Sequence, residues 1–85
     1  MQRVEIYTTP FCPYCIAAKR LLTKKGATFE ETDVSGDFAE RQRMMVRAHG
    51  RNTVPQIFIG GKHVGGSDEL HSLDRAGRLE PMLAG

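Results

Sequence analysis

The apolar and polar residues alternate strictly near the N-terminus of the chain. Over Arg3–Thr8, valine, isoleucine and threonine occupy every second position, with arginine, glutamate and tyrosine between them. A two-residue period of this kind predicts a β-strand. Two more strands are predicted at Phe29–Asp33 and Gln56–Ile59. The pair Gly60-Gly61 is typical of a two-residue hairpin turn, and it leads into a partner strand at Lys62–Val64.

Helical signals separate these strands. A proline suits the first turn of a helix, where its missing N–H is not needed, and a helix is predicted over Pro13–Lys25. A second helix is predicted to follow a capping residue at Asp37 and to end at Gly50. The segment Ser67-Asp68-Glu69 then opens a third helix, because it combines a cap with two acids at the positive end of the dipole. We expect Leu70, Leu73 and Ala76 to line the inner side of this helix.

The predicted order of elements is β-α-β-α-β-β-α, which places the chain in the α/β class. A β-α-β unit requires parallel strands joined by a right-handed crossover, whereas the later hairpin adds antiparallel pairing. We therefore expect a four-stranded mixed sheet flanked by helices. No linker or internal repeat interrupts the pattern, so residues 1–85 are interpreted as a single domain.

Composition narrows the classes of partner. The net charge of +2 is too small to indicate a nucleic-acid surface, and no apolar run approaches the length of a membrane helix. The N-terminus has Glu5 where a signal peptide would be apolar, so we expect a cytosolic protein. The basic residues form two clusters, which are either solvated helix faces or a surface that attracts an anionic small molecule or protein. The clusters are Lys19, Arg20, Lys24 and Lys25, and Arg41, Arg43, Arg47 and Arg51.

The two cysteines have C-x-x-C spacing and lie where a strand gives way to a helix. A structural disulfide would close only a minimal loop, and cytosolic thiols are normally reduced. A structural zinc site needs four ligands, but there is no second cysteine pair and the three histidines are scattered, so no metal is expected. Two unrelated core cysteines are a further alternative. A redox-active dithiol explains the spacing and the position best.

The two thiols are not expected to be equivalent. Cys12 precedes the helix, where the free N–H groups of Tyr14 and Cys15 can point at its sulfur and stabilise a thiolate. Cys15 recurs with Ala18 and Leu22 on one helical stripe, so its side chain should be turned inward. Cys12 is therefore interpreted as the exposed, attacking thiol and Cys15 as the resolving thiol.

Four motifs occur in the order found in one known family, and the chain resembles a dithiol glutaredoxin over its whole length. The motifs are Ile6-Tyr7-Thr8, Cys12-Pro13-Tyr14-Cys15, Thr53-Val54-Pro55 and Gly65-Gly66-Ser67-Asp68. The resemblance implies a thioredoxin-like fold, a cis Pro55, and a Val54 backbone that pairs with the cysteine of glutathione.

The resemblance also implies a site for the γ-glutamyl end of glutathione. Its carboxylate suits the N–H groups at the start of the third helix, and its ammonium group suits the carboxylate of Asp68. Without the resemblance, Ser67 and Asp68 are a helix cap. The complete predicted set of glutathione contacts is Thr9, Tyr14, Gln42, Thr53, Val54, Pro55, Gly66, Ser67 and Asp68.

Gln42 and Thr9 differ from the other members of this set. Gln42 falls on a predicted inner stripe of the second helix, formed by Phe38, Met45 and Ala48, and a polar group there needs a partner. The partner of Gln42 is either the glycine carboxylate of glutathione or the local backbone. Arg43 is the alternative residue for binding that carboxylate. At Thr9 the chain departs from the family, since many glutaredoxins have a lysine three residues before the first cysteine.

The resemblance implies an enzyme that reduces protein–glutathione mixed disulfides and protein disulfides with glutathione as cosubstrate. No permanently bound cofactor is expected, and the partners are glutathione and disulfide-containing or glutathionylated proteins, met by a monomer. Two alternatives stay open. One is a thioredoxin-like electron donor reduced by a flavoprotein, and the other is a module that holds an iron–sulfur cluster between two chains.

Overall fold

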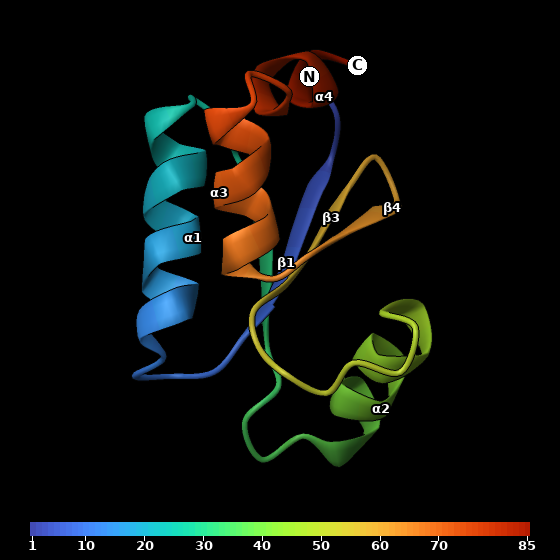
Figure 1. The fold of residues 1–85 in the computed structure, drawn as a ribbon. Coiled ribbons are helices and arrows are strands. Elements are labelled where there is room, and N and C mark those ends of the chain that lie inside the picture. Colours follow the sequence, from blue (N-terminus) through green and yellow to red (C-terminus); the bar gives the residue numbers. More distant parts are fainter.

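The computed structural model describes residues 1–85, which form a four-stranded sheet with helices on both faces (Figure 1). The strands are β1 (Val4–Thr8), β2 (Glu30–Asp33), β3 (Gln56–Ile59) and β4 (Lys62–Gly65), in the order β2-β1-β3-β4. β1 pairs with β2 in parallel, and β3 pairs with both β1 and β4 in antiparallel fashion. The predicted mixed sheet of a thioredoxin-like fold is thus confirmed.

The helices are α1 (Pro13–Lys24), α2 (Phe38–Arg47), α3 (Ser67–Arg75) and α4 (Leu79–Ala84). The last was not predicted, because its six residues are too few for a helical period and Pro81 lies among them. It nevertheless buries Leu79 and Leu83. None of the helices combines the length and apolarity needed to cross a lipid bilayer.

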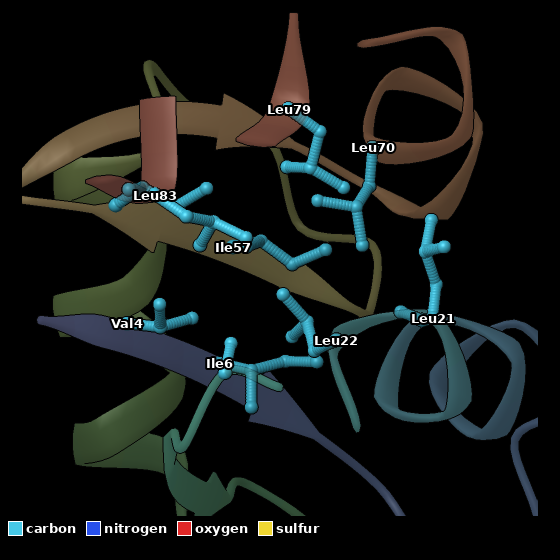
Figure 2. Close-up of a cluster of buried hydrophobic side chains, with 11 residues drawn as sticks. Val4, Ile6, Leu21, Leu22, Ile57, Leu70, Leu79 and Leu83 are labelled. Carbon is cyan, nitrogen blue, oxygen red and sulfur yellow. The ribbon is translucent and has the colours of Figure 1, made fainter. Parts of the chain in front are cut away.

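The larger apolar core lies between the sheet and the helices α1, α3 and α4 (Figures 1 and 2). The alternation in β1 explains it: Val4 and Ile6 face this core, and the antiparallel partner β3 contributes Ile57 and Ile59. From α1 come Ala18, Leu21 and Leu22, packed beside Leu70 of α3. This packing fixes α1 and α3 side by side, so their N-terminal ends are held at the same edge of the molecule (Figure 1).

A second core lies on the opposite face, under α2. The side chains of Tyr7 and Phe58 project from the sheet on this side and pack edge to face, with ring centroids 5.9 Å apart. Met44 of α2 and Ala48, the residue that caps the end of this helix, cover them. The sheet is therefore the middle layer of three.

The predicted inner stripe of α2 is confirmed for Ala48, which is fully buried, and for half-buried Met45, which packs against the same core. It is wrong for Phe38, which is 78% exposed, and for Gln42, which is exposed, whereas Met44 is fully buried. The inward face lies about one residue further round the helix, because Arg47 lies along the sheet and bonds Glu5 and the Tyr7 hydroxyl. An arginine stem covers apolar surface while its charged end is paired, so an inner face need not be apolar in sequence.

The ends of two helices also differ from the prediction. α2 ends at Arg47 rather than Gly50, because His49 and Gly50 both adopt positive φ. Ala76 is exposed rather than inward, because α3 ends at Arg75 and the chain turns at Gly77. The inner side of α3 is formed by buried Leu70 and half-buried Leu73.

Candidate active site

The two cysteines lie at the N-terminus of α1. Cys12 is the capping residue in extended conformation, and its Sγ accepts a hydrogen bond from the Cys15 N–H at 3.1 Å. Of the two N–H groups predicted to point at this sulfur, only that of Cys15 makes the bond. Pro13 occupies the first helical turn, as predicted, where its lack of an N–H costs nothing.

Burial separates the two thiols, which are both unpaired in this structure. Cys15 is 1% exposed and Cys12 is half-buried, so the predicted asymmetry is confirmed. Burial raises the pKa of the Cys15 thiol to about 12, and the hydrogen bond with Cys12 acts in the same direction. At neutral pH Cys15 is therefore a protonated thiol, and Cys12 is the sulfur that a substrate can reach.

The loop before β3 approaches the same sulfur. The Val54–Pro55 peptide bond is cis, as the resemblance implied. The Cys12 thiol points at the Val54 carbonyl oxygen, with a distance of 3.9 Å between Sγ and O. Pro55 is buried, and β3 begins directly after it.

A cavity of about 230 Å³ extends from this loop to the start of α3. All of the predicted glutathione contacts except Thr9 and Gln42 line it, together with two residues that were not among the predicted contacts. The lining residues are Tyr14, Arg51, Thr53, Val54, Pro55, Gly66, Ser67, Asp68 and Glu69. Three segments that are distant in the sequence are thus brought to one site.

The start of α3 forms one wall of the cavity. Its capping residue is Gly66, not Ser67, and the Glu69 carboxylate accepts a hydrogen bond from the Gly66 N–H at 2.6 Å. The first N–H groups of a helix have no partner within it, which leaves those of Ser67 and Asp68 for an anion. The two walls are close together, since a Cβ at Gly66 would lie in ordinary van der Waals contact with the Pro55 carbonyl oxygen at 3.4 Å.

Arg51 and Glu69 line the cavity although neither was among the predicted glutathione contacts; Arg51 was named only within a basic cluster and Glu69 only at a helix start. Arg51 Nη1 lies 2.9 Å from Glu69 Oε1 across the cavity wall. The Gly66 N–H and then the Arg51 guanidinium hold the pKa of Glu69 below its usual range. The capping pattern could have indicated Glu69, but no sequence signal joins it to an arginine eighteen residues earlier.

Thr9 and Gln42 lie outside the cavity. Thr9 is half-buried, and its backbone interacts with the Cys15 sulfur, which partly offsets the rise in the pKa of that thiol. Gln42 is exposed, and its Nε2 lies 4.0 Å from the Met45 sulfur. The alternative for Gln42, Arg43, pairs with Glu40. No group of three or more His, Cys, Asp or Glu side chains is arranged to hold a metal ion.

Comparison with known proteins places these features in context. A family model described as Glutaredoxin matches residues 4–64. The chain is 52% identical to Glutaredoxin 3 of Escherichia coli (strain K12), over 98% of this chain and 99% of that protein. It is 51% identical to a glutaredoxin of Pseudomonas aeruginosa, over 99% of both chains.

Solved structures agree with the sequence relatives. A buckwheat glutaredoxin–glutathione complex superposes with a TM-score of 0.88 at 31% identity, covering 98% of this chain and 77% of that chain. A solution structure of glutaredoxin from Brucella melitensis has a TM-score of 0.85 at 53% identity, covering 98% and 89%.

Proposed function

Since the chain belongs to the glutaredoxin family, whose members are glutathione-dependent thiol–disulfide oxidoreductases, we propose that it reduces protein–glutathione mixed disulfides with glutathione as electron donor. We further propose that it reduces protein disulfides by the same dithiol. The observation that carries the proposal is the position of Cys12. Its sulfur points at the Val54 carbonyl, and Val54 lines the cavity that meets the start of α3.

The first step is a thiol–disulfide exchange at Cys12. Its thiolate attacks the glutathione-side sulfur of the mixed disulfide, so the substrate disulfide breaks and a Cys12–glutathione disulfide forms. The departing protein thiolate takes a proton from water. A second glutathione, as thiolate, then attacks the glutathione sulfur of this adduct, which returns Cys12 and forms glutathione disulfide.

Cys15 takes part only when the substrate is a protein disulfide. The substrate protein is then linked to Cys12, and Cys15 loses its proton and attacks Cys12, releasing the reduced protein. Two glutathione molecules reduce the resulting Cys12–Cys15 disulfide. Because the pKa of Cys15 is raised to about 12, this thiol does not compete with Cys12 for the first attack.

The cavity supplies the preference for glutathione. The Val54 backbone would pair with the cysteine of the tripeptide, and the N–H groups of Ser67 and Asp68 would receive the γ-glutamyl carboxylate. The Asp68 carboxylate would take the adjacent ammonium group. The buckwheat complex supports this ligand, since a structurally similar glutaredoxin binds glutathione. Two predicted glutathione contacts lie outside the cavity. Thr9 would contact the ligand from beside the dithiol, and Gln42 would reach it from α2.

The remaining parts of the proposal concern the protein as a whole. Residues 1–85 would act as one domain and as a monomer, without a permanently bound cofactor, in the cytosol. A reducing compartment supplies the glutathione that the cycle consumes.

Turnover of a glutathionylated substrate tests the proposed function. Glutathione, glutathione reductase and NADPH report each cycle as oxidation of NADPH. We expect Cys12→Ser to abolish turnover, and Cys15→Ser to retain much of it with a glutathionylated peptide but to lose it with a protein disulfide. If Cys15→Ser were as inactive as Cys12→Ser with the glutathionylated peptide, the assignment of the two thiols would be wrong.

A further inference from the structure

A series of hydrogen bonds runs through the buried side chain of Gln56, behind the cavity wall. Gln56 is fully buried, which is costly for an amide unless its polar atoms are paired. Its Nε2 donates to the Thr53 carbonyl oxygen at 2.9 Å and contacts the Thr53 hydroxyl oxygen at 3.2 Å. Its Oε1 lies 2.7 Å from Nε2 of His63. Gln56 therefore joins a lining residue of the cavity to a histidine of β4.

The direction of this chain follows from the Thr53 carbonyl. A carbonyl oxygen can only accept, so the nitrogen of Gln56 must face it and the oxygen of Gln56 must face His63. That oxygen also accepts, so the hydrogen of the neutral His63 ring is on Nε2. Nδ1 of His63 is then an acceptor, and Nδ1 of His49, 3.1 Å away, must donate to it. Each residue therefore donates to the next one nearer the cavity: His49 to His63, His63 to Gln56, and Gln56 to Thr53.

The surroundings favour this neutral form of His63. The ring packs against Phe58 at a tilt of 33°, with centroids 5.0 Å apart. The charged groups that face it are Arg47 of α2, His49 and Arg51 of the following loop, and Glu69 of α3, of which only Glu69 favours protonation. Burial, and then the neighbouring His49 and Arg51, lower the pKa of His63.

These hydrogen bonds determine whether the Thr53 hydroxyl donates or accepts toward a ligand. A lone pair of its hydroxyl faces the Gln56 amide, so the hydroxyl hydrogen is available to donate into the cavity. We propose that Gln56 and His63 are positioning residues that orient the Thr53 hydroxyl toward an anionic group of glutathione, with His49 keeping His63 in the required tautomer. This inference rests on the proposed function, because it assigns glutathione to the cavity.

Acid that makes both rings cationic breaks this hydrogen-bond chain. The hydrogen added to His63 is on Nδ1 and faces Nδ1 of His49 across 3.1 Å. A cationic His49, whose charge is one cause of the lowered pKa of His63, has a hydrogen on its own Nδ1 as well, so two donors and two like charges face each other. The ring then moves away from His49 and releases Gln56, and Thr53 loses its fixed orientation. Because the pKa of His63 is lowered, glutathione binding should be constant near neutral pH and should weaken only below the ordinary histidine value of 6.5.

Binding of S-methylglutathione, measured by calorimetry, tests the proposal. This probe keeps the charges of glutathione but has no thiol to titrate. His63→Gln retains a donor that reaches Gln56 and does not titrate, whereas His63→Asn is too short to reach it. We expect His63→Asn to bind about three- to tenfold more weakly than wild type at neutral pH, as for the loss of one hydrogen bond. His63→Gln should bind like the wild type at neutral pH and keep that affinity at pH about 5.

His49→Gly provides a second, independent comparison. His49 has a φ of 58°, which glycine adopts without cost, so this variant should fold. Without a donor facing Nδ1, protonation of His63 no longer displaces it, and affinity should persist at pH about 5, where the wild type is weakened.

The outcomes separate the two claims. If the wild type binds the probe but has the same affinity at both pH values and equals His49→Gly at each, the inference is overturned. Equal binding by His63→Asn and His63→Gln would overturn it too. If the wild type does not bind the probe at all, the proposed function itself fails, and the inference fails with it.

Discussion

At the scale of single residues, two cysteines three positions apart differ in solvent exposure. Cys12 caps the start of α1 and is half-buried, whereas Cys15 lies on the buried side of the helix. The stripe of Cys15, Ala18 and Leu22 is visible in the sequence, since helical periodicity depends only on local spacing. The contact of Cys12 with the Val54 carbonyl is not local, because 42 residues separate the two. From the residues alone it could not be predicted, and only the family resemblance indicated it.

Thr9 provides a test of electrostatics at this scale. It lies beside the dithiol but has no charge, so it adds no Coulombic attraction for a thiolate. We expect Thr9→Lys to speed alkylation of Cys12 by iodoacetamide at neutral pH by about two- to tenfold, because a nearby cation favours the thiolate. The measurement uses the Cys15→Ser background, so that only one thiol reacts.

Salt is the control for this prediction. The gain from Thr9→Lys should shrink as ionic strength rises, because screening weakens the interaction of exposed charges. Thr9→Gln, of similar reach but neutral, should leave the alkylation rate near that of the threonine protein. An unchanged rate in Thr9→Lys would show that residue 9 does not direct its side chain toward the sulfur.

At the scale of elements, regular periodicity predicted the strands well and the faces of helices less well. β1, β3 and α1 follow simple patterns of apolar residues, whereas β2 has no apolar residue and β4 was predicted from the hairpin turn before it. The inner face of α2 was predicted only in part, since Arg47, ion-paired with Glu5 and 4.0 Å from the centroid of the Phe58 ring, also lies toward the sheet. Such pairings depend on which elements become neighbours, and residue spacing within one helix does not contain that information.

The start of α3 is predicted to bind the γ-glutamyl end of glutathione through Asp68, and a substitution there tests this. Asp68→Asn removes the charge expected to receive the ammonium group of glutathione, while Gly66 and Glu69 still cap the helix. A hydrogen bond to a charged group contributes about 1.5–3 kcal/mol, so we expect affinity for S-methylglutathione to fall by about tenfold to a hundredfold.

The matched control for Asp68→Asn is Glu80→Gln, which removes one negative charge from α4 at an exposed position outside the cavity. It should leave the affinity nearly unchanged. Equal affinity in Asp68→Asn and Glu80→Gln would show that Asp68 only contributes to the helix start.

At the scale of the whole molecule, titrating groups on both faces of the sheet define the pH range of stability. Burial lowers the pKa of His63 below 6.5, so the unfolded chain binds a proton first as the pH falls, and stability is lost below that value. The pKa of Cys15 is raised from 9.0 to about 12, so the unfolded chain loses its proton first, and stability falls above pH 9.0. Lowered pKa values at Glu5, Glu31 and Glu69 add a further loss below pH 4.5.

We therefore expect the free energy of unfolding of the reduced protein to be greatest between pH 6.5 and 9.0. Urea unfolding at a series of pH values measures it. Cys15→Ser should flatten the alkaline decline, and His63→Gln should flatten the part of the acid decline that begins below pH 6.5. An alkaline decline of the same size in Cys15→Ser would mean that another group causes it.

The overall arrangement was predictable because it depends on the order of elements, and the assembled site was predictable in outline. The segments at Cys12, Thr53 and Gly66 each carry a recognisable motif, and the cavity brings all three together. What the sequence could not provide are pairings across elements, such as Arg51 with Glu69 and His63 with Gln56. These depend on side chains whose neighbours are set only by the tertiary fold.

The most direct test of the central claim is the identity of the covalent adduct that Cys12 forms. Cys15→Ser is mixed with a glutathionylated protein, without free glutathione, and the products are analysed by mass spectrometry after proteolysis. The account predicts a glutathione adduct on Cys12 and release of the substrate protein as a free thiol. A Cys12 adduct with the substrate protein, or no adduct on Cys12, would contradict it.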